Sequence, residues 1–234
     1  MNLDEFTTTL NEQTVLVTGA GGTVGSEIVR KLMNLHPKQI VCVGRNREKI
    51  CSIFETSNSK VIVETFDICD KEQVSRVFYK YNPNIVFHLA AEKDIRLTNA
   101  DPFKCVFVNV MGTLNILQST KDIGSDSLIF TSSIKANDPT SIMGATKRIG
   151  ELLVRSAAMQ SGKLYYTVRL SNVMESDGGV YSLFCSQIEN GGPITITDPD
   201  AVRVFVSAKE TAELLLDSLQ CASDGCILGL AGGD

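Results

Sequence analysis

A glycine-rich turn between an apolar run and an amphipathic segment is the feature that most constrains this fold. Residues 15–17 are apolar, residues 18–25 carry the turn, and residues 26–32 have the pattern of a helix. Gly19 would make the tight turn, Gly22 would admit a pyrophosphate close to the backbone, and Gly25 would let the helix approach the strand. Free amides at the start of the helix would face the phosphates. This strand–turn–helix context predicts dinucleotide binding rather than an ordinary βα turn.

Composition excludes several other classes of function. The 234 residues are 43% hydrophobic, which fits one globular domain over residues 1–234 with at most a small appendage. The net charge of -5 argues against a surface that tracks nucleic-acid phosphates. No uncharged stretch approaches the roughly 20 apolar residues of a membrane span, and residues 1–5 lack the basic start of a signal peptide. We therefore expect a cytoplasmic protein with a small-molecule partner.

The seven cysteines do not predict a disulfide framework. Their number is odd, no Cys-x-x-Cys pair occurs, and several lie in apolar runs such as residues 41–43. We expect reduced thiols in the core. Cys221 and Cys226 have no histidine nearby, because the two histidines are at 36 and 88, so no metal site is predicted.

Six apolar runs alternate with helical patterns, which predicts an α/β fold: a doubly wound parallel sheet with helices on both faces and ligands at the carboxyl ends of the strands. The expected strands are 15–17, 39–43, 60–66, 84–89, 127–131 and 165–170. The first helix should end near Leu35, because Pro37 forbids its continuation. His88, inside an apolar strand, is expected to be a core residue. A long helix should start at Asp101-Pro102 and carry Val106, Val110, Leu114 and Leu117 on one face.

The residue at the tip of the second strand indicates which cofactor binds. An acidic residue there would bond the ribose 2′-hydroxyl of NAD, whereas an arginine suits a 2′-phosphate. The position is Arg45, within a basic cluster, so we expect NADP, with NAD as the alternative. Asp67, after the third strand, could bond the adenine amine, or the acidic pair that it forms with Asp70 could serve only to cap the next helix. Ala90 and Ala91 are small enough to let the cofactor lie against the backbone.

Several segments resemble the extended short-chain dehydrogenase/reductases, and within them the CapD-like polysaccharide-biosynthesis branch of UDP-N-acetylglucosamine 4,6-dehydratases. The similarity extends over roughly residues 12 to 230, and the run Met-Gly-Ala-Thr-Lys-Arg at 143–148 is specific to the branch. The matching segments are 18–25, 87–93, 109–115, 139–148, 168–173 and 191–200, followed by Arg203. The resemblance implies a Rossmann fold, a nicotinamide cofactor and a UDP-sugar substrate.

The resemblance also implies a chemistry and assigns roles to residues. Such enzymes oxidise the sugar at C4 by hydride transfer, remove the C5 proton, expel the C6 hydroxyl as water and return the hydride to C6. Ser133 would bond the C4 oxygen, Lys135 would take the C5 proton, and Lys147 would bind the nicotinamide ribose. Met143 stands where most of the superfamily has a tyrosine base. The expected catalytic residues are thus Ser133, Lys135, Met143 and Lys147.

The remaining contacts follow from the motifs and the resemblance together. The residues expected at the cofactor are Gly19, Gly22, Thr23, Val24, Gly25, Arg45, Asp67, Ile68, Leu89, Ala90, Ala91, Lys93, Asn109 and Lys147. Those expected at the substrate are Lys93, Ser133, Asn172 and Arg203.

Two departures from the branch restrict the expected chemistry. The carboxylic acid that would protonate the departing hydroxyl is replaced by Ile134, which cannot donate a proton, so elimination should be impaired. Asp138 and Glu92 are the conceivable replacements. The chain also stops where relatives continue, so residues 172–206 should form a reduced substrate-binding lobe, and Asp177 replaces a basic residue.

The sequence therefore predicts an NADP-dependent enzyme that modifies a nucleotide sugar, most similar to a UDP-N-acetylhexosamine 4,6-dehydratase and expected to be a homo-oligomer. A 4-epimerase or ketoreductase is the enzymatic alternative. A catalytically degenerate protein that binds the dinucleotide as a scaffold or sensor is the non-enzymatic one.

Overall fold

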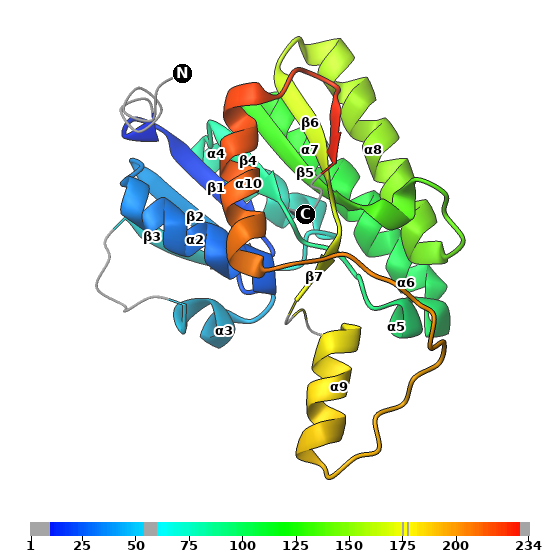
Figure 1. Cartoon of the computed structure of the whole chain (residues 1–234). Coiled ribbons are helices and arrows are strands. Elements are labelled where there is room, and N and C mark those ends of the chain that lie inside the picture. Colours follow the sequence, from blue (N-terminus) through cyan, green and yellow to red (C-terminus); the bar gives the residue numbers. More distant parts are fainter. Residues whose placement is uncertain (1–9, 54–59, 175, 177, 230–234) are drawn as a thin grey trace.

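The computed structural model describes residues 10–53, 60–174, 176 and 178–229, and its centre is a parallel sheet (Figure 1). The strands are β1 Thr14–Thr18, β2 Gln39–Gly44, β3 Val61–Thr65, β4 Ile85–His88, β5 Ser127–Ser133, β6 Leu164–Leu170 and β9 Ile227–Gly229. Their order is β3-β2-β1-β4-β5-β6-β9, and every pairing is parallel. All six expected strands are confirmed, and β9 is an addition that the sequence did not predict, because three residues are too few to show a pattern.

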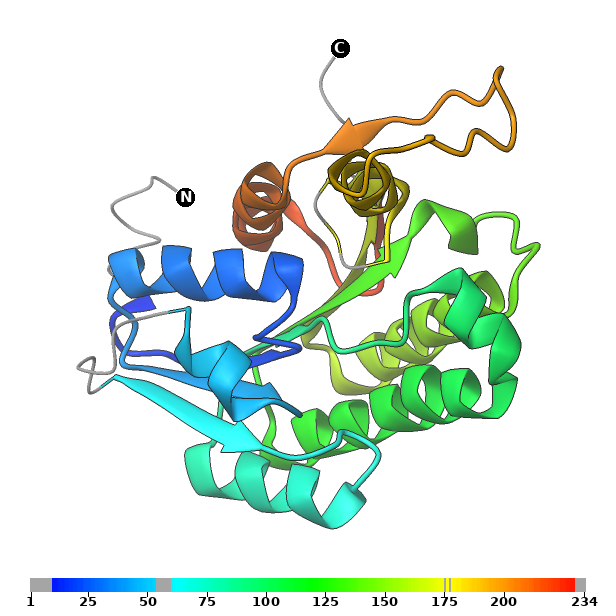
Figure 2. The ribbon, with the colours of Figure 1, turned by 90° about the horizontal axis from the view of Figure 1, so that it is seen from below.

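Helices cover both faces of this sheet, as expected for a doubly wound fold. The helices are α2 Thr23–Leu35, α3 Arg47–Cys51, α4 Lys71–Tyr81, α5 Ile95–Ala100, α6 Pro102–Val106, α7 Thr113–Ile123, α8 Ile142–Ser161, α9 Val180–Glu189 and α10 Ala208–Cys221. Figure 2 shows α2 and α10 on one face of the sheet and α4, α7 and α8 on the other. The first helix ends at Leu35, as predicted from Pro37.

Strand β1 shows how the sequence builds both core layers at once. Val15 and Val17 pack into the layer that includes Ile28 of α2 and Leu215 of α10. Leu16 points to the opposite face and packs into the layer that includes Phe78 of α4. All six of these side chains are fully buried. Each contributes roughly 1.5–3 kcal/mol of transfer free energy, so a continuous apolar strand is what a sheet covered on both sides requires.

The long helix expected after Asp101 is interrupted, and the prediction of its buried face is wrong. Asp101 caps α6, but a π-helical turn, η1 (Phe107–Gly112), separates α6 from α7. The extra residue in a π turn rotates the helix face. As a result Val106 and Leu114 are 44% and 41% exposed, and only Leu117 of the expected stripe is fully buried.

His88 is a core residue, as expected, but not all the cysteines are. The ring of His88 lies between Thr18 Oγ1, 2.8 Å from Nδ1, and Thr113 Oγ1, 2.9 Å from Nε2. Burial, with Lys147 nearby, lowers the pKa of His88 to about 3, so the ring is neutral. Every cysteine is free, as expected, yet only Cys42 and Cys105 are buried. The expectation of core thiols was too broad, because the rest lie at helix ends or on half-exposed faces.

Residues 172–206 contain a second, two-stranded sheet and a helix. Strand β7 (Asn172–Val173) pairs in parallel with β8 (Phe205–Val206). Helix α9 lies between them in sequence and extends away from the main body in Figure 1. None of its residues is fully buried. No helix in the described parts of the chain combines the length and the apolar character needed to cross a membrane.

Candidate active site

A cavity of about 730 Å³ opens at the carboxyl ends of the strands. It lies where the strand order reverses between β1 and β4, the place where doubly wound sheets bind their ligands. The glycine turn, the ends of β2, β4, β5 and β6, and segments around β7 and β8 all contribute to its wall. Of the residues expected from the sequence at cofactor or substrate, all but Asn109 line it.

The glycine turn has the geometry that its spacing predicts. Gly19 has φ +69°, a conformation that suits glycine, and a Cβ there would lie 2.8 Å from Ala90 N. A Cβ on Gly25 would lie 2.2 Å from Gly19 O, so only glycine lets α2 start this close to β1. Gly22 is the N-cap of α2 and no side chain caps the amides that follow it. Those amides, including those of Thr23 and Val24, are therefore available to an anion.

Charged residues gather at the end of the cavity formed by β2 and β3. Arg45 lines the cavity, and its Nη2 lies 3.1 Å from Glu92 Oε1. Asp67 lines it too, and its Oδ1 accepts a hydrogen bond from Cys69 N at 2.9 Å. Asp70 is the N-cap of α4, accepting from Gln73 N at 3.1 Å. Helix capping therefore belongs to Asp70, and the role of Asp67 toward adenine stays a prediction.

Asn109 has a structural position and does not line the cavity. It is buried in the π turn η1. Its Oδ1 accepts from Glu92 N at 2.8 Å, and its Nδ2 donates to Glu92 O at 2.9 Å and to Thr146 Oγ1 at 3.0 Å. Asn109 thus fixes the loop that follows β4, which is how it can influence a ligand without touching it.

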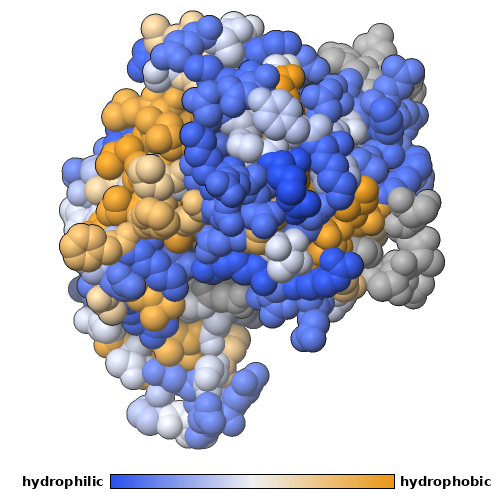
Figure 3. Space-filling model, turned by 180° about the vertical axis from the view of Figure 1, so that it is seen from behind, coloured by the Kyte–Doolittle hydropathy of each residue, from blue (hydrophilic) through white to orange (hydrophobic). Residues whose placement is uncertain are grey.

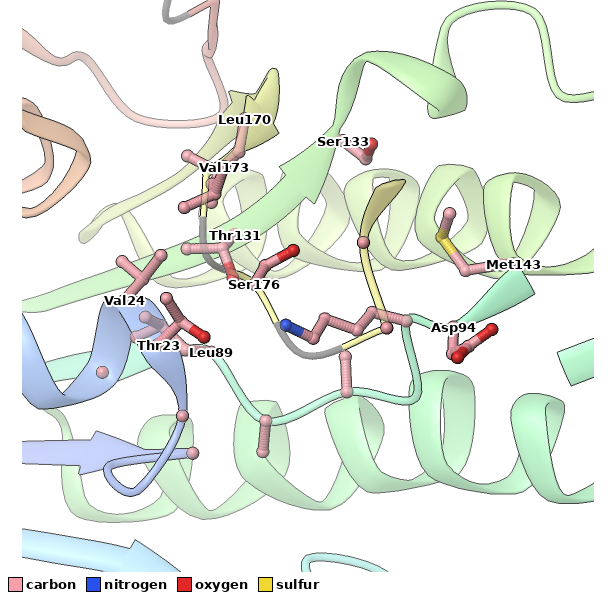
Figure 4. A pocket seen from close by; sticks show the side chains of 18 of the residues that line it. Thr23, Val24, Leu89, Asp94, Thr131, Ser133, Met143, Leu170, Val173 and Ser176 are labelled. Carbon is pink, nitrogen blue, oxygen red and sulfur yellow. The ribbon is translucent and has the colours of Figure 1, made fainter. Parts of the chain in front are cut away.

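The expected catalytic residues come together on the wall of the cavity opposite the glycine turn. Ser133 ends β5, Lys135 lies in the 3-10 turn η2 (Ile134–Ala136), and Met143 and Lys147 lie on α8. All four line the cavity, and Figure 4 shows Ser133 and Met143 across from Thr23 and Val24 of α2. The first turn of α8 can approach η2 because residue 144 is glycine: a Cβ there would lie 2.5 Å from Lys135 O.

Burial changes the protonation of both lysines. Lys147 Nζ donates to Thr131 O at 2.8 Å and lies 4.7 Å from the ring centre of Phe130. Burial lowers the pKa of Lys147 to about 8. Burial and then the nearby charge of Arg203 lower the pKa of Lys135 as well. Both amines can therefore give up a proton more readily than an exposed lysine.

The replacement acids that the sequence suggested do not line the cavity. Glu92 pairs with Arg45 at the other end, and Asp138 is exposed on the loop after η2. Ile134 is itself 44% exposed and is not among the residues that line the cavity. Besides Asp67 at the β2 and β3 end, the carboxylate that lines the cavity is Asp94, which caps α5 and lies near Met143 in Figure 4. Although burial raises the pKa of Asp94, hydrogen bonds from the backbone and side chain of Arg96 lower it overall, which keeps it ionised.

Glu151 is a further residue that the sequence analysis missed. Its buried carboxylate accepts from Ser132 Oγ at 2.7 Å and from Arg169 Nε and Nη2, each at 2.8 Å. Arg148 Nη1 donates to it at 2.8 Å. These bonds hold the end of β5 against α8 and β6, where Ser133 begins the catalytic wall. The signal was a glutamate one turn after Lys147 on the buried face of α8.

Two of the candidate substrate residues, Asn172 and Arg203, lie on the segments around β7 and β8, whereas Lys93 lies in the loop after β4. Lys93, Asn172 and Arg203 all line the cavity, and Asn172 Nδ2 donates to Val204 O at 3.0 Å. Gly178 lies against the body of the protein, since a Cβ there would be 2.5 Å from Asp94 Oδ2. Tyr181 and Phe205 also line the cavity and had no motif to reveal them. Asp177 lies outside the described residues.

Comparison with known proteins finds similar sequences and a similar fold in longer chains. The probable polysaccharide biosynthesis protein EpsC of Bacillus subtilis is 35% identical over 224 residues, which are 93% of this chain and 38% of that protein. The inverting UDP-N-acetylglucosamine 4,6-dehydratase of Campylobacter jejuni is 26% identical and covers 90% of this chain and 64% of its own length. The structure of Thermus thermophilus UDP-glucose 4-epimerase in complex with NAD superimposes with a TM-score of 0.80 at 25% identity, covering 94% of this chain and 78% of that one.

The match to a protein family extends along almost the whole sequence. The chain spans less than two fifths of the length of EpsC. The family match covers residues 15–233, from β1 past β9, and so includes the glycine turn, the lysines of the catalytic wall and the segments around β7 and β8. The chain belongs to the polysaccharide biosynthesis protein family.

Proposed function

We propose that this chain binds NADP and modifies a UDP-linked sugar, with chemistry of the 4,6-dehydratase type. The observation that carries the proposal is one cavity that brings the glycine turn, Arg45, Ser133, Lys135 and Lys147 together. The similarity to a UDP-N-acetylglucosamine 4,6-dehydratase supports the substrate class. Residues 172–206 would act as a reduced lobe that holds the nucleotide sugar, and the whole of residues 1–234 would act as one unit around the cofactor.

The residues present fit a dinucleotide. The Cβ position of Gly22 meets only Gly19 O, at 3.1 Å, so its outer side is open toward the cavity. The uncapped amides of α2 supply donors for a pyrophosphate, and Ala90 and Ala91 leave room beside the backbone. Arg45 can bond a 2′-phosphate in two places. When bound, the nicotinamide would accept and return the hydride.

The residues of the catalytic wall supply the remaining steps. The Ser133 hydroxyl can hydrogen-bond the sugar C4 oxygen and fix its orientation. Lys147, held by Thr131 O, places a positive charge where the ribose and the oxidised C4 oxygen would lie. Lys135, whose pKa is lowered by burial, can take the C5 proton in its neutral form. Each role uses a side chain that lines the same cavity.

The protonation of the C6 hydroxyl is the weakest step, which gives the alternative functions their support. Hydroxide is a poor leaving group, and an acid at this step is typically worth ~10²–10⁴-fold. Ile134 offers none, and Asp94 is held as a carboxylate. C4 epimerisation or ketoreduction needs no such acid. A dinucleotide-binding scaffold or sensor would need neither Lys135 nor Ser133.

One experiment separates these functions. Purified protein is incubated with NADP and a panel of UDP-sugars in deuterated water, and the products are followed by NMR. Dehydration places deuterium at C5, epimerisation inverts C4 without it, and a scaffold gives no product. We expect slow dehydration of UDP-N-acetylglucosamine, abolished in Lys147→Ala. Turnover that survives Lys147→Ala would place the active site elsewhere.

We further propose that the protein assembles with copies of itself. A band of apolar surface lies along one edge of Figure 3, on the side of α6 and α8. Phe103 and Phe107 are 86% and 55% exposed there, and Leu152 and Met159 of α8 are exposed too. Burying such a patch is favourable in proportion to its area. Light scattering after size-exclusion chromatography measures the mass, and Phe103→Lys should shift it to that of one chain.

We place this activity in the cytoplasm. The free thiols fit a reducing compartment. Fractionation of cells that express the tagged protein, with a periplasmic and a membrane marker as controls, tests this.

A further inference from the structure

The ion pair between Arg45 and Glu92 joins two loops across the end of the cavity where a cofactor 2′-group would lie. Arg45 Nη2 is 3.1 Å from Glu92 Oε1. The two side chains differ in exposure, at 59% for Arg45 and 15% for Glu92. Glu92 Oε1 is buried and receives no hydrogen bond from the described residues. The ion pair with Arg45 is therefore what offsets the cost of burying the Glu92 carboxylate. The guanidinium of Arg45 is more exposed and can turn toward another anion.

The backbone of Glu92 is fixed more firmly than that of an ordinary loop residue. Asn109 bonds both its N–H and its C=O, at 2.8 and 2.9 Å. Asn109 is itself buried and bonded to Thr146. The other cation near Glu92 is Lys104, whose Nζ lies 3.9 Å from Oε1. The backbone that carries the carboxylate is thus held at this position, and Arg45 is the more exposed member of the pair.

We infer that Glu92 is a specificity-determining residue that weakens the preference of Arg45 for a 2′-phosphate. The inference rests on the proposed cofactor function. To bind the phosphate of NADP, Arg45 must leave Glu92, and a shielded carboxylate then loses its nearest cation. NAD leaves the ion pair intact. Glu92 therefore keeps the affinities for the two cofactors closer together than Arg45 alone would make them.

The test compares the affinities for NADPH and NADH, measured by fluorescence titration, in wild type and Glu92→Gln. The amide keeps the size of the side chain and removes its charge. We expect the ratio of the NADH to the NADPH dissociation constant to rise about 3–10-fold, as for removal of one partly exposed ion pair that the phosphate must otherwise displace. The increase should shrink at 0.5 M salt. Glu189→Gln, an exposed glutamate at the end of α9, makes the same change in net charge and should leave the ratio unchanged.

A second background shows whether Glu92 acts through Arg45. In Arg45→Ala, the Glu92→Gln substitution should change the ratio less than twofold, because the contested guanidinium is absent. An equal increase in both backgrounds would overturn the mechanism, since it would mean direct repulsion of the phosphate. An unchanged ratio in folded Glu92→Gln would overturn the inference alone. Wild type that binds neither cofactor would refute the proposed function and the inference with it.

Discussion

The half of the molecule that carries the glycine turn and the segment that carries α9 are built in opposite ways. Strand β1 buries all five of its residues, and α2 packs four residues into the core. Helix α9 buries none, and Ile196 and Val202 in the segment after it are 65% and 84% exposed. The first region is held by its own core. The second is placed mainly by the β7–β8 pairing and by contact with Asp94, so it depends on what else lies against it.

Two phenylalanines, one from each region, give the most direct test of whether the two regions differ in stability. Phe87 of β4 is fully buried, whereas Phe205 of β8 is 37% exposed. Phe87→Ala should lower the free energy of unfolding by about 3–5 kcal/mol, through lost burial and the cavity left behind. Phe205→Ala should cost less than about 1 kcal/mol. Urea unfolding measures both, and equal costs would show that the two regions share one core.

Within the region that has its own core, the buried charge of Lys147 is expected to lower the free energy of unfolding. Its pKa is lowered to about 8, so the folded protein disfavours the charged form by roughly 3 kcal/mol. Lys147→Met removes that penalty and loses one hydrogen bond, worth about 1 kcal/mol. We expect the variant to be about 2 kcal/mol more stable at pH 7.

The pH dependence of the free energy of unfolding shows whether the charge of Lys147 causes this difference in stability. Between its folded pKa of about 8 and its unfolded value of 10.5, the unfolded chain binds more protons at this residue. The stability of wild type should therefore rise relative to Lys147→Met across that window and the gap should close. Urea unfolding of both proteins from pH 7 to pH 10 checks this. A variant less stable than wild type at pH 7 would contradict the penalty.

The third prediction concerns binding without a change of fold. Gly22 has φ −81° and ψ 169°, backbone angles that valine can adopt, and the 3.1 Å contact of a Cβ with Gly19 O needs a shift of only a few tenths of an ångström. Its side chain would occupy the side open to the cavity, so Gly22→Val should weaken NADPH and NADH at least about 100-fold, or about 2.7 kcal/mol. Circular dichroism and titration measure fold and affinity together. Gly229→Ala, where a Cβ meets nothing within 4 Å, is the control, and undiminished binding by Gly22→Val would remove the glycine turn from the site.

The smallest effects are expected at the exposed residues after α9. Ile196→Ser and Val202→Ser should each change the free energy of unfolding by less than about 0.5 kcal/mol, because neither side chain leaves a buried position. Thermal unfolding of both variants measures this. A cost above about 1 kcal/mol would show that these side chains are covered in solution, by a second copy or by further chain.

The sequence predicted the sheet because its strands are apolar on both faces, and it predicted the cavity wall because glycine spacing and strand ends determine where ligands meet a doubly wound sheet. It did not predict the pairing of Arg45 with Glu92, since the two residues follow different strands and nothing in either motif relates them. Nor did it predict that Ile134 is absent from the cavity lining, because a three-residue 3-10 turn has no periodic pattern. It assigned Asn109 to the cofactor, where the structure gives it a bond to the backbone of Glu92.

The π turn η1 has a consequence for how this chain can vary in length. Its one extra residue sets the rotation between α6 and α7. The turn contains Asn109, which bonds Glu92, and is followed directly by Thr113, which bonds His88. Deleting one residue here would let a regular α-helix form and would turn everything before it by about 100° relative to α7. Substitutions at exposed positions such as Met111 cost little by comparison. Homologous chains should therefore vary in residue type along η1 while keeping its residue count, and loops elsewhere should carry the insertions.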